Sequence, residues 1–143
     1  KIYEPEKSCD EFHENLPEIF ITLGEISVEN ENFKLAVADI NKGIELLKKC
    51  SDNERRLAEA YFKLGTTFVL NSERNEAIDA FKSAKNCLSS YLTKLDNESD
   101  EAKEIREVLF KELDLKIEET DMLRKEEIEM VKNAINQNVA GLT

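Results

Sequence analysis

The chain has 143 residues, of which six are glycine or proline and none is tryptophan, and its net charge is −11. This length suits one compact unit, and the composition favours helices with essentially no sheet. The negative charge argues against direct binding of nucleic acid or of an anionic membrane surface, because both ligands need a cationic face. It favours a basic protein partner. No apolar run approaches the ~18 residues of a membrane span.

Residues 1–15 are acidic and carry no repeat pattern, so we interpret them as a poorly ordered lead-in or as the remnant of an interrupted upstream repeat. Within this segment, Cys9 and His13 have the spacing of two helical metal ligands, but no second pair accompanies them. We therefore predict no metal and no cofactor. The chain's three cysteines are odd in number and widely spaced, which resembles no disulfide framework and favours a reducing compartment.

The chain repeats itself at an offset of 41 residues. This offset pairs Phe20 with Tyr61, Leu23 with Leu64, Gly24 with Gly65, Ala36 with Ala77, Ile40 with Phe81, and Gly43 with Ala84. An aromatic residue, then Leu-Gly, then small, bulky and small residues is the pattern of a tetratricopeptide (TPR) repeat. The small residues let two antiparallel helices approach closely. We therefore predict an all-α, TPR-like solenoid of helix-turn-helix units.

We assign residues 16–50 to TPR repeat one and residues 53–95 to TPR repeat two. Pro17 suits the first turn of a helix, and Asn30, Asn32, Asn71 and Ser72 suit the turns between helices. The predicted helices run from about Leu16 to Asn30, Phe33 to Lys49, Glu54 to Leu70, and Glu73 to Leu95.

Residues 98–140 predict a long, charged C-terminal capping helix, or helices, opening at Ser99. One apolar stripe, which suits a cap over the last repeat, consists of Ala102, Ile105, Leu109, Leu113 and Ile117. A second stripe consists of Val108, Leu115 and Met122, and helical spacing continues through Ile128, Val131, Ile135 and Val139 after a bend expected near Thr120 and Asp121. Arrays normally need about three repeats, so we expect further N-terminal repeats, self-association, or both. A homodimer through the second stripe is one hypothesis.

The first helix of each TPR unit lines the concave face of the solenoid. Counting from the two glycines places there Glu18, Ile21, Glu25, Val28 and Glu29, followed by Glu59, Phe62, Thr66 and Val69. The predicted groove has an apolar floor and acidic walls without a compensating lysine, which suits arginine or lysine interleaved with small apolar residues. The candidate partner-binding residues are Glu18, Glu25, Glu29, Glu59, Phe62 and Thr66. The alternative is that these glutamates form only a solvated helix face.

Two stretches, L-G-E-I-S-V-E-N-E-N-F at 23–33 and R-L-A-E-A-Y-F-K-L-G-T-T-F-V-L-N-S-E-R-N-E-A-I-D-A-F at 56–81, resemble the histone-binding interrupted-TPR (SHNi-TPR) family. The similarity covers roughly residues 16–123. It implies an ATP-independent histone chaperone, nuclear with a cytoplasmic pool. The implied clients are the core histones of the nucleosome's central tetramer, and linker histone as a further client. It also implies that Glu25, Glu29, Glu59 and Phe62 contribute to the histone-binding surface. The family's additional repeats, long acidic tract and basic import segment are not visible here.

A second function class, a general TPR peptide-binding adaptor or co-chaperone scaffold, stays open from the sequence. Adaptors that hold the C-terminal carboxylate of heat-shock proteins place lysine and asparagine at groove positions that carry Ile21, Glu25, Phe62 and Thr66 here, so a carboxylate would be repelled. We expect no enzymatic activity, because neither a glycine-rich phosphate loop nor a marked acid-base pair is recognisable.

Overall fold

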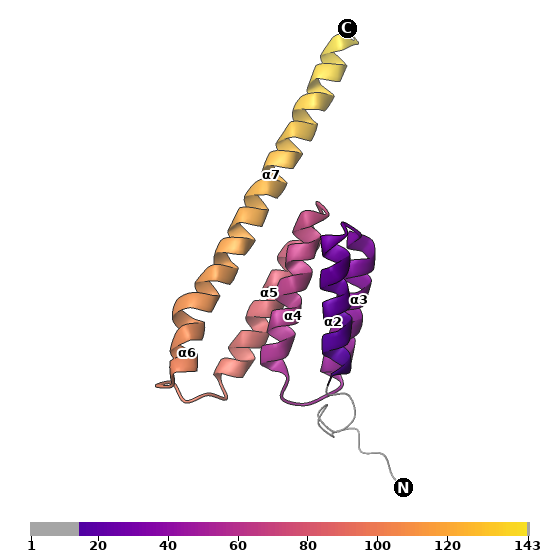
Figure 1. Ribbon diagram of the computed structural model, residues 1–143. Helices are drawn as coiled ribbons and strands as arrows, with labels where there is room; N and C mark the ends of the chain where they lie inside the picture. Colours follow the sequence, from indigo (N-terminus) through magenta and orange to yellow (C-terminus); the bar gives the residue numbers. More distant parts are fainter. Residues whose placement is uncertain (1–14, 143) are drawn as a thin grey trace.

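The computed structural model describes residues 15–142, and this part of the chain is helical without strands (Figure 1). Its helices are α2 (Leu16–Glu29), α3 (Phe33–Lys48), α4 (Glu54–Leu70), α5 (Arg74–Leu92), α6 (Asp100–Glu104) and α7 (Phe110–Gly141), with a π-helical turn at Ile105–Leu109. The predicted all-α, TPR-like solenoid is confirmed. The acidic lead-in lies outside the described residues except for Asn15. Within residues 15–142 no helix is long and apolar enough to cross a membrane.

Helix boundaries follow local side-chain chemistry. The Asn32 side chain accepts a hydrogen bond from the backbone N–H of Leu35 at 3.4 Å and begins α3. The connections after α2, α3 and α4 each contain a residue with positive φ: Glu31 at 60°, Asp52 at 60° and Ser72 at 62°. Of the four residues predicted to supply turns, only Ser72 adopts this left-handed conformation. The predicted bounds of α4 are confirmed, whereas α5 begins one residue later and ends three residues earlier than predicted.

The same glycine contact occurs in both helix pairs. A Cβ atom at Gly24 would lie 2.5 Å from Cγ1 of Ile40, and one at Gly65 would lie 2.6 Å from Cε1 of Phe81. Both the glycines and the bulky residues are related by the offset of 41 residues. The α2–α3 and α4–α5 pairs therefore depend on the absent glycine side chain at equivalent places.

The hydrophobic core has two parts. One joins α2 and α3 to α4 and α5, and its buried residues are Ile21, Ile40, Ile44, Leu47, Ala60, Leu64 and Ala80. The other joins α4 and α5 to the C-terminal segment, and its buried residues are Ala58, Ala77, Phe81, Ala84, Leu88, Ile105 and Leu113. The predicted first stripe covers α4 and α5, whereas Val108, Leu115 and Met122 of the second stripe are each more than half exposed.

The bend expected near Thr120 and Asp121 is wrong, because α7 runs unbroken from Phe110 to Gly141. Thr120 is buried, and its hydroxyl donates a hydrogen bond to the carbonyl of Lys116 at 2.7 Å. The hydroxyl therefore has its hydrogen-bond acceptor within the same helix. The irregularity falls earlier, at the π-helical turn Ile105–Leu109. This turn rotates the following residues relative to α6.

The cysteines also depart from expectation. Cys50, two residues after the end of α3, is disulfide-bonded, which the spacing of the cysteines did not predict. Cys87 on α5 is a half-buried free thiol, and burial raises its pKa. Cys9 and His13 lie outside the described residues. In the described part of the chain, no group of three or more side chains could hold a metal ion.

Candidate functional site

Four of the six predicted partner-binding residues meet in one hollow between α2 and α4, which we call the α2–α4 groove. It is lined by Glu25, Val28, Glu29, Ile40, Phe62, Lys63, Thr66 and Thr67. Ile40 and Val28 form an apolar floor, and Glu25 and Glu29 stand exposed at its edge. The groove therefore offers carboxylates beside apolar surface, as the sequence predicted.

A second hollow, the α4–α7 groove, separates α4 from the capping helix. It is lined by Arg55, Ala58, Glu59, Phe62, Lys63, Leu88, Leu109, Glu112 and Leu113. Glu59 lies here rather than beside Glu25. The sequence placed Leu109 on the capping stripe but did not predict that it lines a groove, and it did not mark Glu112 at all, because the rotation of α7 depends on the π-helical turn. The spacing of Leu109, Glu112 and Leu113, which puts them on one helical face, was the available signal.

Phe62 and Lys63 line both grooves and so mark the ridge between them. The half-buried ring of Phe62 lies against Phe81, with centroids 5.7 Å apart and planes inclined by 52°. Phe81 in turn packs on Gly65. The repeat packing thus fixes the position of the aromatic ring between the two grooves.

The other predicted concave-face residues lie elsewhere. Glu18 lines a separate hollow with Asn15, Ile19, Thr22 and Leu23 near the start of α2. Ile21 is 3% exposed and packs against Gly43, so its assignment to the groove surface is wrong. A Cβ atom at Gly43 would lie 2.8 Å from Ile21, which shows that this side chain fills the α2–α3 contact instead.

Three of the four predicted glutamates form ion pairs with α4, which contradicts the expectation of acidic walls without compensation. The carboxylates of Glu18 and Glu25 lie 3.2 and 3.3 Å from the cationic groups of Arg56 and Lys63, respectively. The two glutamates are seven residues apart on α2, and their two cationic partners are seven residues apart on α4. Two parallel ion pairs therefore connect the helices. The carboxylate of Glu59 lies 3.7 Å from Arg55 on its own helix.

Glu29 is exposed like these glutamates but differs from them, because it forms no ion pair with any residue in the range 15–142. The paired glutamates have side chains that are about half exposed or more. Exposed ion pairs contribute only about 0 to 1 kcal/mol, so an incoming cation can replace the intramolecular one at little cost. The α2–α4 groove therefore holds one unpaired carboxylate and one exchangeable carboxylate.

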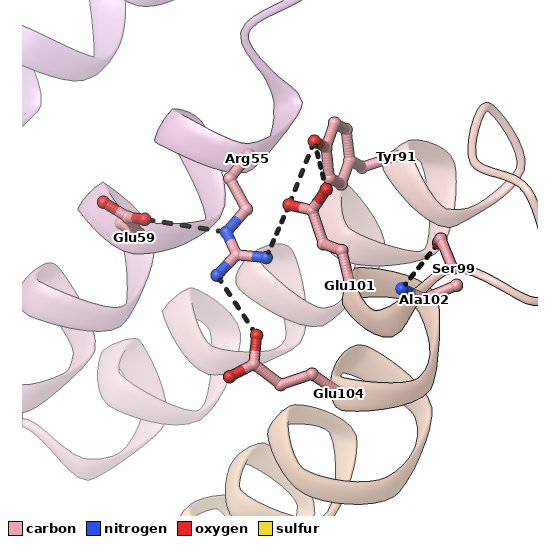
Figure 2. A network of polar contacts seen from close by, with 7 residues as sticks. All are labelled: Arg55, Glu59, Tyr91, Ser99, Glu101, Ala102 and Glu104. Carbon is pink, nitrogen blue, oxygen red and sulfur yellow. Dashed lines mark hydrogen bonds and ion pairs between the residues drawn. The ribbon is translucent and has the colours of Figure 1, made fainter.

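Arg55 connects α4 to the cap through a network of carboxylates (Figure 2). Its guanidinium lies 3.2 Å from Glu101 and 3.9 Å from Glu104, besides the contact with Glu59. The Tyr91 hydroxyl donates to both oxygens of the same Glu101 carboxylate at 3.1 Å. Burial and this hydrogen bond raise the pKa of Tyr91. The network fixes the cap where it closes the α4–α7 groove.

Comparisons with known proteins find a family match over the first helix pair. The SHNi-TPR family model matches residues 17–54, which contain all of α3 and all of α2 after Leu16. The human nuclear autoantigenic sperm protein is 30% identical over 83 residues, which are 57% of this chain and 10% of that protein. The corresponding protein of Bos taurus is also 30% identical over 83 residues, 57% of this chain and 11% of that protein.

A further relative is histone-binding protein N1/N2 of Xenopus laevis, which is 35% identical over 60 residues, 41% of this chain and 10% of that protein. The chain thus spans 10 to 12% of the length of the curated relatives that it matches. Residues 17–54 are therefore similar to the SHNi-TPR family, and the chain is similar to nuclear autoantigenic sperm proteins over 57% of its length.

Proposed function

We propose that this chain binds histones and acts as an ATP-independent histone chaperone. The observation that carries the proposal is the α2–α4 groove, where the unpaired carboxylate of Glu29 stands beside the apolar side chains of Val28 and Phe62. A basic histone segment with interleaved small apolar residues fits this chemistry. The net charge of −11 and the similarity to histone-binding protein N1/N2 support the same conclusion.

In this proposal, Glu25 and Glu29 bind histone cations in the α2–α4 groove, Glu59 binds in the α4–α7 groove, and Phe62 contacts the client at both. Thr66 is exposed and lines the α2–α4 groove together with Phe62. Glu18 extends the acidic surface towards the start of α2. Bound histone is shielded from non-specific association with nucleic acid, and release follows competition rather than nucleotide hydrolysis.

The proposed clients are the core histones of the central tetramer, with linker histone as a further client. Storage, transport and chromatin assembly require that the protein meets histones both before and after nuclear entry. We therefore propose a nuclear location with a cytoplasmic pool, in line with the similarity to nuclear autoantigenic sperm proteins.

The test is a calorimetric titration of the central-tetramer histone pair into the wild-type chain and into Glu29→Lys. Glu29 makes no ion pair within residues 15–142, so its reversal should leave the fold intact, as circular dichroism would verify. The matched control is Glu45→Lys. Glu45 is exposed on α3 and lines neither groove, so this substitution makes the same change of charge away from both of them. We expect Glu29→Lys to weaken binding at least about tenfold at low salt and the control to change it less than about twofold.

If both variants weakened histone binding equally, the effect would come from net charge alone, and the α2–α4 groove would be rejected as the binding site. The adaptor alternative is favoured by one observation, the apolar floor of the α4–α7 groove formed by Leu88, Leu109 and Leu113. Titration of a heat-shock C-terminal peptide separates the two functions. Peptide binding that persists at high salt, with no histone binding, would establish the adaptor and reject the chaperone.

A further inference from the structure

The connection between α3 and α4, residues 49–53, exposes a serine. Although the preceding residue, Cys50, is disulfide-bonded, Ser51 itself is exposed, and its hydroxyl makes no hydrogen bond within residues 15–142. Other hydroxyl groups in this range donate to backbone carbonyls three or four residues earlier, namely those of Thr66, Thr67, Thr93, Ser99 and Thr120. A modifying enzyme therefore reaches the Ser51 hydroxyl without breaking a hydrogen bond.

The residues after Ser51 carry a charge pattern of the kind that protein kinases recognise. Asp52 follows directly, and Glu54 lies three positions after the serine. Ser51 is the only serine or threonine of the chain that has acidic residues at both positions. Acidophilic serine/threonine kinases select substrates whose carboxylates at these positions meet a basic cleft in the enzyme. The pattern after Ser51 therefore fits this class of kinase.

One lysine pairs with both acidic residues in the folded chain. The Lys94 ammonium lies 3.4 Å from the Asp52 carboxylate and also pairs with Glu54. The contact is possible because the α3–α4 and α5–α6 connections lie at the same end of the molecule (Figure 1). The Lys94 side chain is 49% exposed, so its ion pairs contribute little and the basic cleft of a kinase can replace it.

We propose that Ser51 is a phosphorylation site for an acidophilic serine/threonine kinase, with ATP and Mg²⁺ as the source of the phosphoryl group. The Ser51 Oγ forms a bond to the γ-phosphorus of ATP, the bond from that phosphorus to the bridging oxygen breaks, and ADP leaves. The hydroxyl proton passes to the catalytic base of the kinase. This inference concerns the junction between the two repeats, and it goes beyond the proposed function without depending on it.

Phosphorylation changes the contacts of Lys94. A phosphate on serine carries a charge of about −1.5 to −2 at pH 7 and three strong acceptor oxygens, so it attracts an ammonium more strongly than a carboxylate does. Because Lys94 already contacts Asp52, the residue next to Ser51, the phosphate comes within reach of this flexible side chain. Lys94 then exchanges its carboxylate partners for the phosphate, which connects the junction between the repeats to the end of α5.

The test is incubation of the chain with a purified acidophilic kinase of the casein kinase 2 class, ATP and Mg²⁺, with tandem mass spectrometry to locate the phosphate. We expect Ser51 to be the main phosphorylated residue. Glu54→Gln should slow its modification at least about tenfold, because the recognised carboxylate is lost. The matched control is Glu45→Gln, which removes an exposed carboxylate of α3 outside the pattern and should change the rate less than about twofold.

Lys94→Met separates recognition from loosening of the segment. This variant frees both carboxylates, so we expect it to speed modification of Ser51 about two- to fivefold. Loss of the ion pair alone would therefore speed the reaction, and a slower reaction in Glu54→Gln reports lost recognition by the kinase. Circular dichroism would verify that each variant keeps the helical fold.

Three results would overturn the proposal. They are the absence of phosphate on Ser51, main modification at Ser99, and equal rates in Glu54→Gln and its control. The contact with Lys94 has its own readout in phosphorus NMR. The second pKa of the phosphate, ~6 in free phosphoserine, should lie lower in the wild type than in Lys94→Met. Equal values in the two proteins would reject the exchange of partners by Lys94.

Discussion

The Nζ atom of Lys63 on α4 lies 3.3 Å from Oε2 of Glu25 on α2, across the groove in which we propose that histone cations bind. An intramolecular cation therefore competes with the client for this carboxylate. We predict that Lys63→Met strengthens binding of the histone pair by about two- to fivefold at low salt, because an exposed pair of this kind contributes up to about 1 kcal/mol. Isothermal titration would measure the change.

The control for this prediction is Lys42→Met on α3, which removes the same charge from an exposed position outside both grooves. An equal gain in both variants would mean that only the net charge matters. A loss of affinity in Lys63→Met would mean that the lysine contacts the client directly, and the exchange of cations would be rejected.

The repeat packing was predictable from sequence because small residues leave a periodic trace. Gly24 and Gly65 recur at one offset together with Ile40 and Phe81, and the structure brings these residues into contact. The ion pairs between α2 and α4 were harder to predict from the sequence. They join residues 38 apart in the chain, and only the relative rotation of two helices decides whether such charges meet.

The α4–α7 groove was not predictable in the same way. Apolar spacing correctly predicted that Ile105 and Leu113 pack on the second repeat, since both are buried there. However, the π-helical turn between them carries no glycine or proline that would mark it in the sequence. The bend predicted near Thr120 does not occur, because the threonine hydroxyl donates its hydrogen bond to the Lys116 carbonyl within the helix.

Gly65 provides a test of the packing that fixes Phe62. A Cβ atom at Gly65 would lie 2.6, 2.7 and 2.9 Å from three atoms of the Phe81 ring, so the ring must shift. We predict that Gly65→Ala lowers the free energy of unfolding by about 1 to 3 kcal/mol through overpacking. Gly141→Ala is the control, because a Cβ atom there would meet nothing within 4 Å. Similar urea midpoints for both variants would contradict the close approach of α4 and α5.

The ion pair of Glu54 with Lys94 makes stability depend on pH. The hydrogen bond from Lys94 lowers the pKa of Glu54 from its ordinary value of 4.5, so the unfolded chain binds more protons in that range. Its contribution is complete above pH 4.5 and is lost as the pH falls through the folded-state pKa. We predict that Glu54→Gln unfolds with a shallower acid dependence than the wild type in urea titrations from pH 6 downwards.

Lys94→Met should give the same shallower profile, because it removes the other half of the pair. The double variant should then add nothing to the pH dependence of either single variant. A profile that stays as steep as that of the wild type in both single variants would show that the acid sensitivity comes from other carboxylates.

Arg55 connects the capping segment to α4. Its removal should loosen the capping segment without unfolding the repeats. Glu101 and Glu104 on α6 each face this guanidinium, so Arg55→Met leaves two carboxylates beside Glu59 without a cation. We predict a loss of about 0.5 to 1 kcal/mol in the free energy of unfolding and faster amide exchange in α6 than in α3. Tyr91→Phe removes one hydrogen-bond donor to Glu101 but leaves the ion pairs, so its exchange rates should lie between those of Arg55→Met and the wild type. If Arg55→Met accelerated exchange equally in α3, the arginine would stabilise the whole solenoid rather than the position of its cap.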